Sequence, residues 1–144
     1  IIYTLTGVSC FSEDTGLEVY SLDNEPGVKS GRYGGEGRSD DDNIFKLLDK
    51  LKGGRDRTAR FRTVISLIWK GVEYQFEGIC EGSILEEKRG TNGFGYDPVF
   101  VPAGSTMSFA EMSMEMKNMF SHRKKAADQL VLFLQQHIPA QFKP

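Results

Sequence analysis

Three short stretches of the sequence carry residues whose types and spacing could do chemistry. The first is Glu13-Asp14-Thr15-Gly16, which we expect at the end of a strand. Adjacent carboxylates before a glycine can present oxygen atoms to a hard cation such as Mg²⁺. The same residues also favour an ordinary turn. Taken alone, this stretch leaves a metal site and a plain turn both open.

The second stretch is Gly93-Phe94-Gly95-Tyr96-Asp97-Pro98, in which two aromatic rings alternate with two glycines. Because glycine has no side chain, a flat ligand could lie against Phe94 or Tyr96 without meeting a neighbour. Asp97 could then accept hydrogen bonds from ring N–H groups. The alternative is that both rings belong to the core and the glycines mark a bulge.

The third stretch is Lys117-Asn118-Met119-Phe120-Ser121-His122-Arg123-Lys124. If Ser121 caps a helix, the amides of His122 and Arg123 point out of its N-terminus, which attracts anions. Cations in a first turn oppose the helix dipole, so Arg123 there indicates an anionic or carbonyl-bearing ligand. A solvated basic face is the alternative, and it suits Lys124 and Lys125 better than the pair at 122–123.

Composition limits what the chain can be. Its 144 residues, 39% hydrophobic and 26% charged, predict a single domain, residues 1–144, with one hydrophobic core. The net charge of -2 argues against a general nucleic-acid or membrane surface. We find no membrane-spanning run and no secretory leader, and Cys10 and Cys80 match no metal or redox spacing. We therefore expect a cytoplasmic protein with two reduced thiols.

The elements that must position these stretches follow from periodicity. Residues 1–7 are typical of the tail of an element stopped by Gly7, and residues 8–13 of a short strand. A long loop is expected over 21–43, with Asp41 or Asp42 capping a helix that ends at Gly53-Gly54. Alternation predicts a strand over 58–69, a turn at Lys70-Gly71 and a return strand.

The last third of the sequence is predicted to be helical. Ser108 and Glu111 fit a capping box that opens a helix through about Met119. Ser121 would cap a second helix, with an apolar stripe made of Ala127, Leu130, Val131, Leu134 and Ile138. Helices on both sides of a hairpin predict an α/β fold with a mixed central β-sheet flanked by helices.

Together, five stretches fall in the order and spacing of one family. They are SEDTGLEV, EPGVKSGRYGG, RTARFRTV, GFGYDPVFVP and FAEMSMEMKNMFSHR. The sequence resembles the inosine triphosphate pyrophosphatase family from about Gly7 to Leu134. The resemblance implies Mg²⁺-dependent hydrolysis of non-canonical purine nucleoside triphosphates (ITP, dITP, XTP) to the monophosphate and pyrophosphate. A non-catalytic module that binds purine nucleotides is the alternative.

The resemblance also assigns a base pocket. Phe94 takes the position of the ring that stacks on the purine, and Gly95, Tyr96 and Asp97 complete the pocket. Lys117 takes the position of the lysine that precedes the family's Ser-His-Arg stretch.

The remaining roles fall on both ends of the chain. His122 and Arg123 match the pair with which the family favours a 6-oxo over a 6-amino purine. Asp14 matches the family's essential aspartate, a Mg²⁺ ligand also assigned the activation of water, and Thr15 matches a substrate-contacting serine. The family is usually dimeric, so the resemblance implies a homodimer.

The sequence departs from the family at its front. Family members open with a strand, a Thr/Ser-x-Asn-x-x-Lys phosphate loop and a glutamate that completes the metal site, and this sequence contains none of them. Its first residues resemble the end of the helix that follows. We therefore expect an N-terminally truncated family fold that binds a 6-oxo purine nucleotide, hydrolyses it poorly and leaves an unpaired sheet edge.

Overall fold

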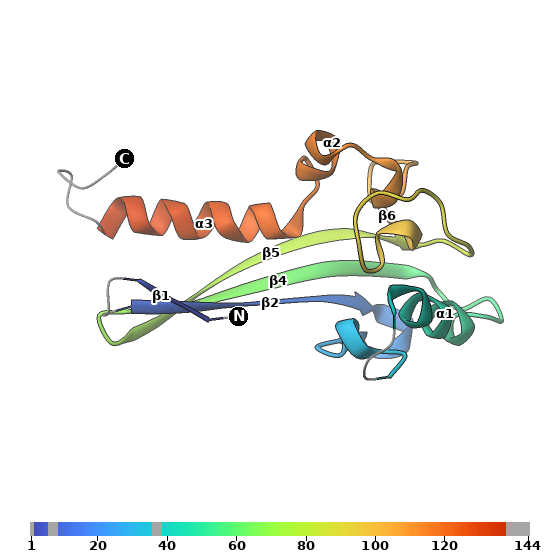
Figure 1. Cartoon of the computed structure of the whole chain (residues 1–144), viewed down its shortest axis with the longest axis horizontal. Coiled ribbons are helices and arrows are strands. Elements are labelled where there is room, and N and C mark those ends of the chain that lie inside the picture. Colours follow the sequence, from blue (N-terminus) through green and yellow to red (C-terminus); the bar gives the residue numbers. More distant parts are fainter. Residues whose placement is uncertain (1, 6–8, 36–38, 138–144) are drawn as a thin grey trace.

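A long, twisted antiparallel sheet forms the centre of the molecule (Figure 1). The computed structural model describes residues 2–5, 9–35 and 39–137, with residues 2–5 and 9–11 described by their backbone alone. The strand order is β1-β2-β4-β5-β6, and β3 pairs with β2. The strands are β1 (Ile2–Leu5), β2 (Ser9–Val19), β3 (Glu25–Gly27), β4 (Thr58–Trp69), β5 (Val72–Ile84) and β6 (Phe100–Pro102).

The predicted α/β class and the flanking helices are confirmed, but the prediction of a mixed sheet is wrong for the described strands. Every described pair runs antiparallel. A parallel pair needs a crossover connection that returns the chain to the same end of the sheet. Helix α1 (Asp40–Lys50) lies between β2 and β4 in the sequence, yet these two strands still run in opposite directions.

The first described strand corrects the expectation for the front of the chain. Ile2–Leu5 is not the end of a helix: it forms β1 and pairs with Ser9–Ser12 of β2. Strand β2 is therefore paired along these residues, and β1 becomes the outer strand of the described sheet. A short apolar run cannot be assigned to helix or strand by periodicity alone. The predicted stop at Gly7 lies outside the described residues.

Strand β2 is longer than predicted. It runs straight through Glu13-Asp14-Thr15-Gly16, so these residues are neither a turn nor a strand end. Gly16 lets β3 pack closely against this part of β2, because a Cβ there would lie 2.5 Å from the carbonyl oxygen of Gly27 on β3. The predicted loop over 21–43 contains β3 and the first turn of α1.

The β4–β5 hairpin follows the prediction. Lys70 and Gly71 both have positive φ, 51° and 80°, as a tight two-residue turn requires. Alternate β4 residues are buried on one face of the sheet, namely Ala59, Phe61, Thr63, Ile65 and Leu67. Cys80 on β5 is a free, buried thiol, and the side chain of Cys10 lies outside the described part.

Two of the helix starts differ from the predictions. Ser39 caps α1, with Asp42 completing the capping box, in place of the predicted Asp41 or Asp42 cap. The capping box at Ser108 is present, but it opens only a 3₁₀ turn, Phe109–Glu111. Met112 is then extended and buried, so helix α2 (Met114–Asn118) begins separately, capped by Ser113.

Helix α3 (His122–His137) packs across the same face of the sheet as the core. Ser121 caps it as predicted, accepting from the Lys124 amide. The predicted stripe is wrong at two positions, because Ala127 and Val131 are exposed, and Ile138 lies outside the described residues. The helix is turned so that a different set faces β4 and β5: Ala126, Leu130, Phe133 and Leu134.

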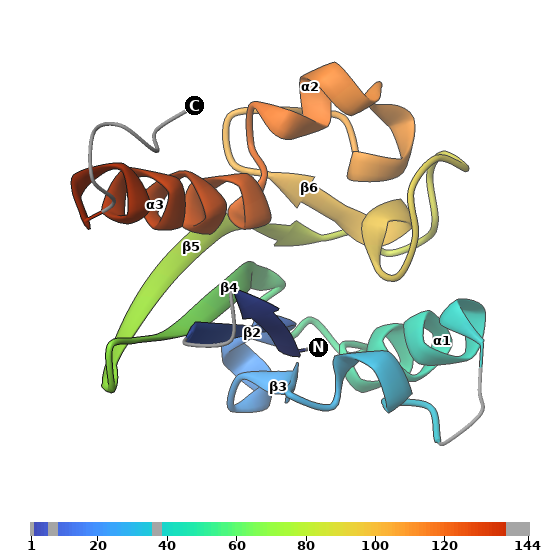
Figure 2. The ribbon, with the colours of Figure 1, turned by 60° about the vertical axis from the view of Figure 1, so that its left-hand side comes forward.

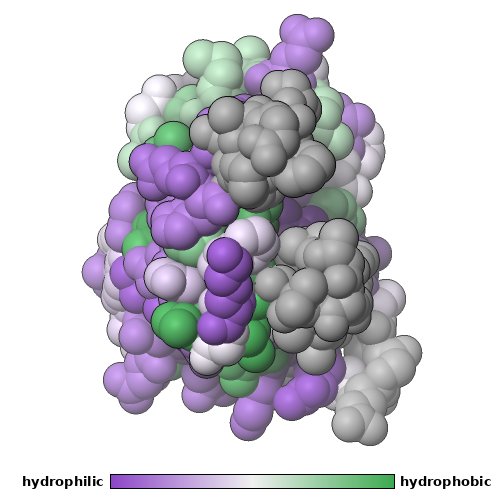
Figure 3. Space-filling model, turned by 90° about the vertical axis from the view of Figure 1, so that its left-hand side faces the viewer, coloured by the Kyte–Doolittle hydropathy of each residue, from purple (hydrophilic) through white to green (hydrophobic). Residues whose placement is uncertain are grey.

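The helices and short strands lie in two groups, which form the two walls of the site described below (Figure 2). Helices α2 and α3 and strand β6 lie on one side, and α1 and β3 lie on the other. At the far end of α3, the Trp69 ring meets Phe133 edge to face, with centroids 6.3 Å apart. Figure 3 views the molecule from this hairpin end, where hydrophilic residues surround smaller hydrophobic areas. No helix in the described ranges is long and apolar enough to cross a membrane.

Candidate functional site

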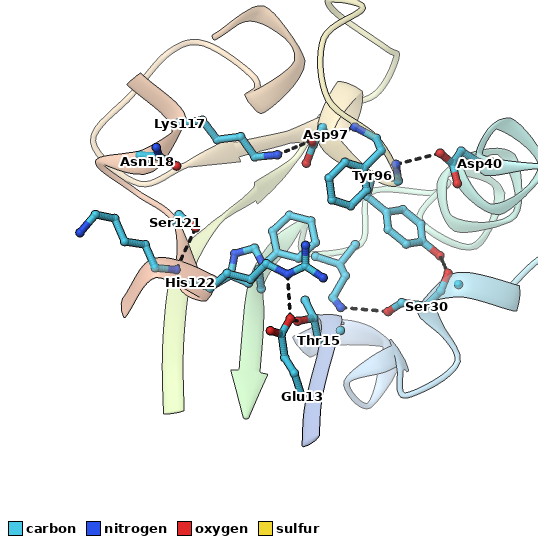
Figure 4. Close-up of a pocket in the computed structure, with 18 of the residues that line it drawn as sticks. Glu13, Thr15, Ser30, Asp40, Tyr96, Asp97, Lys117, Asn118, Ser121 and His122 are labelled. Atoms are coloured by element: carbon cyan, nitrogen blue, oxygen red, sulfur yellow. Dashed lines mark hydrogen bonds and ion pairs between the residues drawn. The ribbon is translucent and has the colours of Figure 1, made fainter. Parts of the chain in front are cut away.

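A pocket of about 540 Å³ opens between the two walls. Figure 4 shows Lys117 and Asp97 on one wall, Thr15 and Ser30 on the other, and His122 between them. Eight of the nine residues predicted for the site line this pocket: Thr15, Phe94, Gly95, Tyr96, Asp97, Lys117, His122 and Arg123. Asp14 does not line it.

The Gly-Phe-Gly loop is shaped by its backbone. Gly93 has a φ of +76°, and a Cβ there would collide with the carboxylate of Asp97. That carboxylate accepts the Phe94 amide at 3.0 Å. Gly95 has a φ of +60°, and its amide donates to Asp40 of α1 at 2.9 Å. The two glycines therefore allow a tight loop that is tied to both walls.

The two rings of this loop have different fates. Tyr96 is buried and donates its hydroxyl to the carbonyl of Ser30 at 2.7 Å, so it belongs to the core. Burial raises its pKa. Phe94 is 63% exposed at the pocket. The core alternative thus holds for Tyr96, and only Phe94 offers a free face to a flat ligand.

Lys117 and Asp97 form a buried ion pair behind Phe94. The Lys117 Nζ lies 2.7 Å from the Asp97 Oδ2, and 4.9 Å from the centroid of the Phe94 ring. Asp97 Oδ2 thus already has two donors, the ammonium and the Phe94 amide. The pair holds the loop and the ring in place, and the charges of Lys117 and Asp97 offset each other.

His122 is buried at the first position of α3 and stacks on Phe61, with ring centroids 4.8 Å apart. Its Nδ1 has no hydrogen-bond partner among the described residues. Burial, aided by Arg123, Lys117 and Lys125, lowers its pKa to about 4. The imidazole is therefore neutral near pH 7. A neutral, buried ring nitrogen calls for a hydrogen-bond partner, which a water or a ligand can supply.

Gly78 of β5 determines how closely α3 approaches the sheet. A Cβ at this position would collide with the carbonyl oxygen of His122 and lie 2.7 Å from the amide of Ala126. Only glycine lets the first turn of α3 lie directly on β5. This contact fixes the height of His122 above the pocket floor.

Arg123 crosses the mouth of the pocket. Its Nε donates to the Oε1 of Glu13 at 2.9 Å, so α3 is joined to β2. Its guanidinium carbon also lies 5.8 Å from the centroid of the Phe94 ring. A cation held here can reach a ligand that lies on Phe94.

Strand β2 places the adjacent carboxylates of Glu13 and Asp14 on opposite faces of the sheet. Glu13 and Thr15 line the pocket, whereas Asp14 between them is exposed and points to the other face of the sheet. The side chain of Asp14 has no hydrogen bond or ion pair within the described residues. No group of three or more His, Cys, Asp or Glu residues in the described part could hold a metal ion.

Several lining residues were not predicted for the site. Glu13 could have been found, because strand alternation places it on the same face as Thr15. Ser30, Phe61 and Asn118 lie in the quoted stretches but had no assigned role. Asp40 and Asn43 of α1 are brought to the pocket by the fold alone.

Comparison with known proteins identifies relatives of the whole chain. The dITP/XTP pyrophosphatase of Christiangramia forsetii is 56% identical over 128 residues, which cover 89% of this chain and 67% of that protein. The dITP/XTP pyrophosphatase of Porphyromonas gingivalis is 54% identical over 129 residues, covering 89% of this chain and 66% of that protein. The chain thus spans about two thirds of the length of these relatives.

Solved structures give the same result. The Staphylococcus aureus Ham1 protein superposes with a TM-score of 0.86 at 42% identity, covering 91% of this chain and 69% of that one. A nucleoside-triphosphatase / dITP/XTP pyrophosphatase from Mycobacterium abscessus superposes with a TM-score of 0.77 at 40% identity, covering 90% and 67%. The sequence profile of the Ham1 family matches residues 1–133. The chain therefore belongs to the Ham1 family.

Proposed function

We propose that the pocket binds the base of a non-canonical purine nucleoside triphosphate (ITP, dITP or XTP). The protein would hydrolyse it to the monophosphate and pyrophosphate, which removes the nucleotide from the pool. The observation that carries the proposal is the buried, unpartnered Nδ1 of His122 beside the exposed ring of Phe94. The names of the relatives, dITP/XTP pyrophosphatases at up to 56% identity, support the same substrate class.

The pocket suits a flat base with a carbonyl group. Phe94 supplies an aromatic ring, and the Arg123 guanidinium, with its N–H donors, lies over this ring at 5.8 Å from the centroid. A 6-oxo purine presents an acceptor to such donors. The 6-amino group of adenine would leave a donor facing a donor, and an unpaired buried group costs free energy.

A Mg²⁺ ion is part of the proposal. Mg²⁺ in phosphoryl-transfer sites takes one or two protein carboxylates and fills its other positions with phosphate oxygens and water. Of the two carboxylates of β2, only Glu13 opens to the pocket, because Asp14 lies on the opposite face of the sheet, so the described residues supply one pocket carboxylate and not a two-carboxylate donor set. Bound there with the substrate, the ion would neutralise phosphate charge. The assignment of Asp14 as ligand and as the base that activates water rests on the family resemblance alone, since Asp14 lies on the face of β2 away from the pocket, and Thr15 is assigned to contact the substrate.

Titration calorimetry and a pyrophosphate-release assay, each with ITP and with ATP, test the proposal. We expect ITP to bind more tightly than ATP, and release with ITP to depend on Mg²⁺. Equal affinities for ITP and ATP would contradict the proposed base recognition. Binding of ITP without any release would favour the second candidate, a purine-nucleotide-binding module without catalysis.

We also propose that the protein acts as a homodimer in the cytoplasm, without nucleic acid or membrane as partner. The dimer rests on the family resemblance. The net charge of -2 supports the absence of a general polyanion-binding surface.

A further inference from the structure

Thr63 is a polar residue at the centre of an apolar face. It lies on β4 between Phe61 and Ile65 and is completely buried. Valine would fill the same volume in a strand without a hydroxyl group to satisfy. The Thr63 hydroxyl has one described partner, the hydroxyl of Thr15 directly opposite on β2, at 2.9 Å.

The direction of this hydrogen bond follows from counting protons. The Thr15 hydroxyl also bonds to the Oε1 of Glu13, at 3.3 Å. An ionised carboxylate can only accept, so Thr15 is the donor in that bond. A hydroxyl has a single proton, and therefore Thr63 must be the donor to Thr15.

The same carboxylate oxygen of Glu13 extends the chain of hydrogen bonds to helix α3. Oε1 of Glu13 accepts from the Nε of Arg123 at 2.9 Å. The chain of contacts thus runs from Thr63 in the core, through Thr15 and Glu13, to Arg123 on α3. Arg123 is half exposed, and a long side chain at such a position has many rotamers available unless a partner fixes it.

We propose that Thr63 is a positioning residue, which holds Thr15 and Glu13 so that Glu13 fixes Arg123 across the pocket. The inference rests on the proposed function, since it assigns this chain of hydrogen bonds a role in nucleotide binding. Without the Thr63 proton, Thr15 can turn away from Glu13, and one of the two donors that orient the carboxylate is lost. Arg123 then loses its fixed position beside Phe94.

Three variants separate positioning from packing. Thr63→Val removes the hydroxyl at constant shape, and Thr63→Ser keeps the hydroxyl but loses a methyl group. Ser66→Ala, on the opposite face of β4, is the matched control for loss of a strand hydroxyl. We expect Thr63→Val to weaken ITP binding about two- to tenfold, the range for one hydrogen bond, with an unchanged or raised melting temperature. Thr63→Ser should bind ITP as the wild type does, even if it melts earlier.

Nuclear magnetic resonance without any nucleotide provides the second readout. The Arg123 Nε–H signal, assigned by its loss in Arg123→Lys, should be protected from exchange in the wild type and in Thr63→Ser, and exposed in Thr63→Val. Equal ITP affinity and equal Nε–H protection in all variants would overturn the inference. Loss of ITP binding in step with melting temperature for both Thr63 variants would also overturn it. If the wild type binds no ITP, the proposed function falls, and the Nε–H signal alone decides whether the chain of hydrogen bonds exists.

Discussion

At the scale of single residues, Phe94 combines exposure with a fixed position. The ring is 63% exposed, yet its position is fixed by two contacts. The Lys117 ammonium lies over the ring, and the Phe94 amide donates to Asp97. We expect Phe94→Ala to weaken ITP binding by about 1–3 kcal/mol, the cost of losing one base-stacking ring, with the fold intact. Calorimetry measures the affinity. Phe45→Ala is the matched control, because Phe45 is 71% exposed and lies outside the pocket. Unfolding of Phe94→Ala would mean that the ring belongs to the core.

The two carboxylates of β2 can be distinguished by paired substitutions. We expect Asp14→Asn to reduce Mg²⁺-dependent pyrophosphate release by at least about 10²-fold, the usual cost of losing a general base, while ITP still binds. Glu13→Gln should instead weaken ITP binding, because Glu13 holds Arg123. The comparison needs turnover and affinity for both variants. If Asp14→Asn turns over normally and Glu13→Gln does not, Glu13 takes the role assigned to Asp14.

His122 makes stability depend on pH. Its pKa is about 4 in the folded protein, against 6.5 for an ordinary histidine, so between these values the unfolded chain binds a proton more readily. The stability that comes from keeping His122 neutral is complete above pH 6.5 and is lost as the pH falls towards 4. At about 1.4 kcal/mol per pKa unit, the loss approaches 3 kcal/mol.

Denaturant unfolding between pH 7 and pH 4 measures this loss. Carboxylates titrate in the same range, so the His122 contribution is the difference between the wild type and His122→Gln. His137→Gln, at the other histidine, is the control for replacing a histidine elsewhere in the chain. Identical profiles for the wild type and His122→Gln would contradict a buried neutral imidazole.

At the scale of elements, the contact between α3 and β5 carries both stability and site geometry. A methyl group at Gly78 would collide with the His122 carbonyl, so Gly78→Ala must push α3 away from the sheet. We expect a loss of about 1–3 kcal/mol in the free energy of unfolding, typical of overpacking, and weaker ITP binding because His122 moves. Gly31→Ala is the control for stability, since a Cβ there has nothing within 4 Å. A Gly78→Ala variant as stable as Gly31→Ala would contradict the close approach.

What the sequence predicts depends on how local the signal is. The β4 strand and the Lys70-Gly71 turn were predicted correctly because alternation and turn chemistry act over a few residues. The Ser121 cap was correct for the same reason. The helix after Ser108 was extended too far, because the burial of Met112, which ends the 3₁₀ turn, depends on distant residues.

The site shows the same division. The resemblance identified eight residues that line one pocket in the structure, but it could not show which way each side chain points. Glu13-Asp14 was expected as a turn, in which both carboxylates could face one ligand. In the straight β2 strand they alternate, and Glu13 faces the pocket instead of Asp14. Tyr96 lines the pocket as expected, and the fold adds a contact that the resemblance did not give, from its hydroxyl to the carbonyl of Ser30.

At the scale of the whole molecule, one face of the sheet carries charged side chains. Glu18, Arg60, Arg62 and Glu77 pair across the strands on this face. A face with paired charges does not by itself drive association, so the proposed dimer must be tested directly. Sedimentation equilibrium should give twice the chain mass of 16.1 kDa at micromolar concentration. A single species of 16.1 kDa across the concentration range would contradict the dimer.

The contact between Trp69 and Phe133 has a consequence for optical measurements. Trp69 is the one tryptophan of the chain, and it lies on β4 outside the pocket. Its partner Phe133 is eleven residues along α3 from His122, or about 16 Å of helix. Its fluorescence therefore reports how the end of α3 sits on the hairpin and does not report contact with a bound base. A change of emission during a nucleotide titration would show that filling the pocket moves the end of α3 relative to the β4–β5 hairpin.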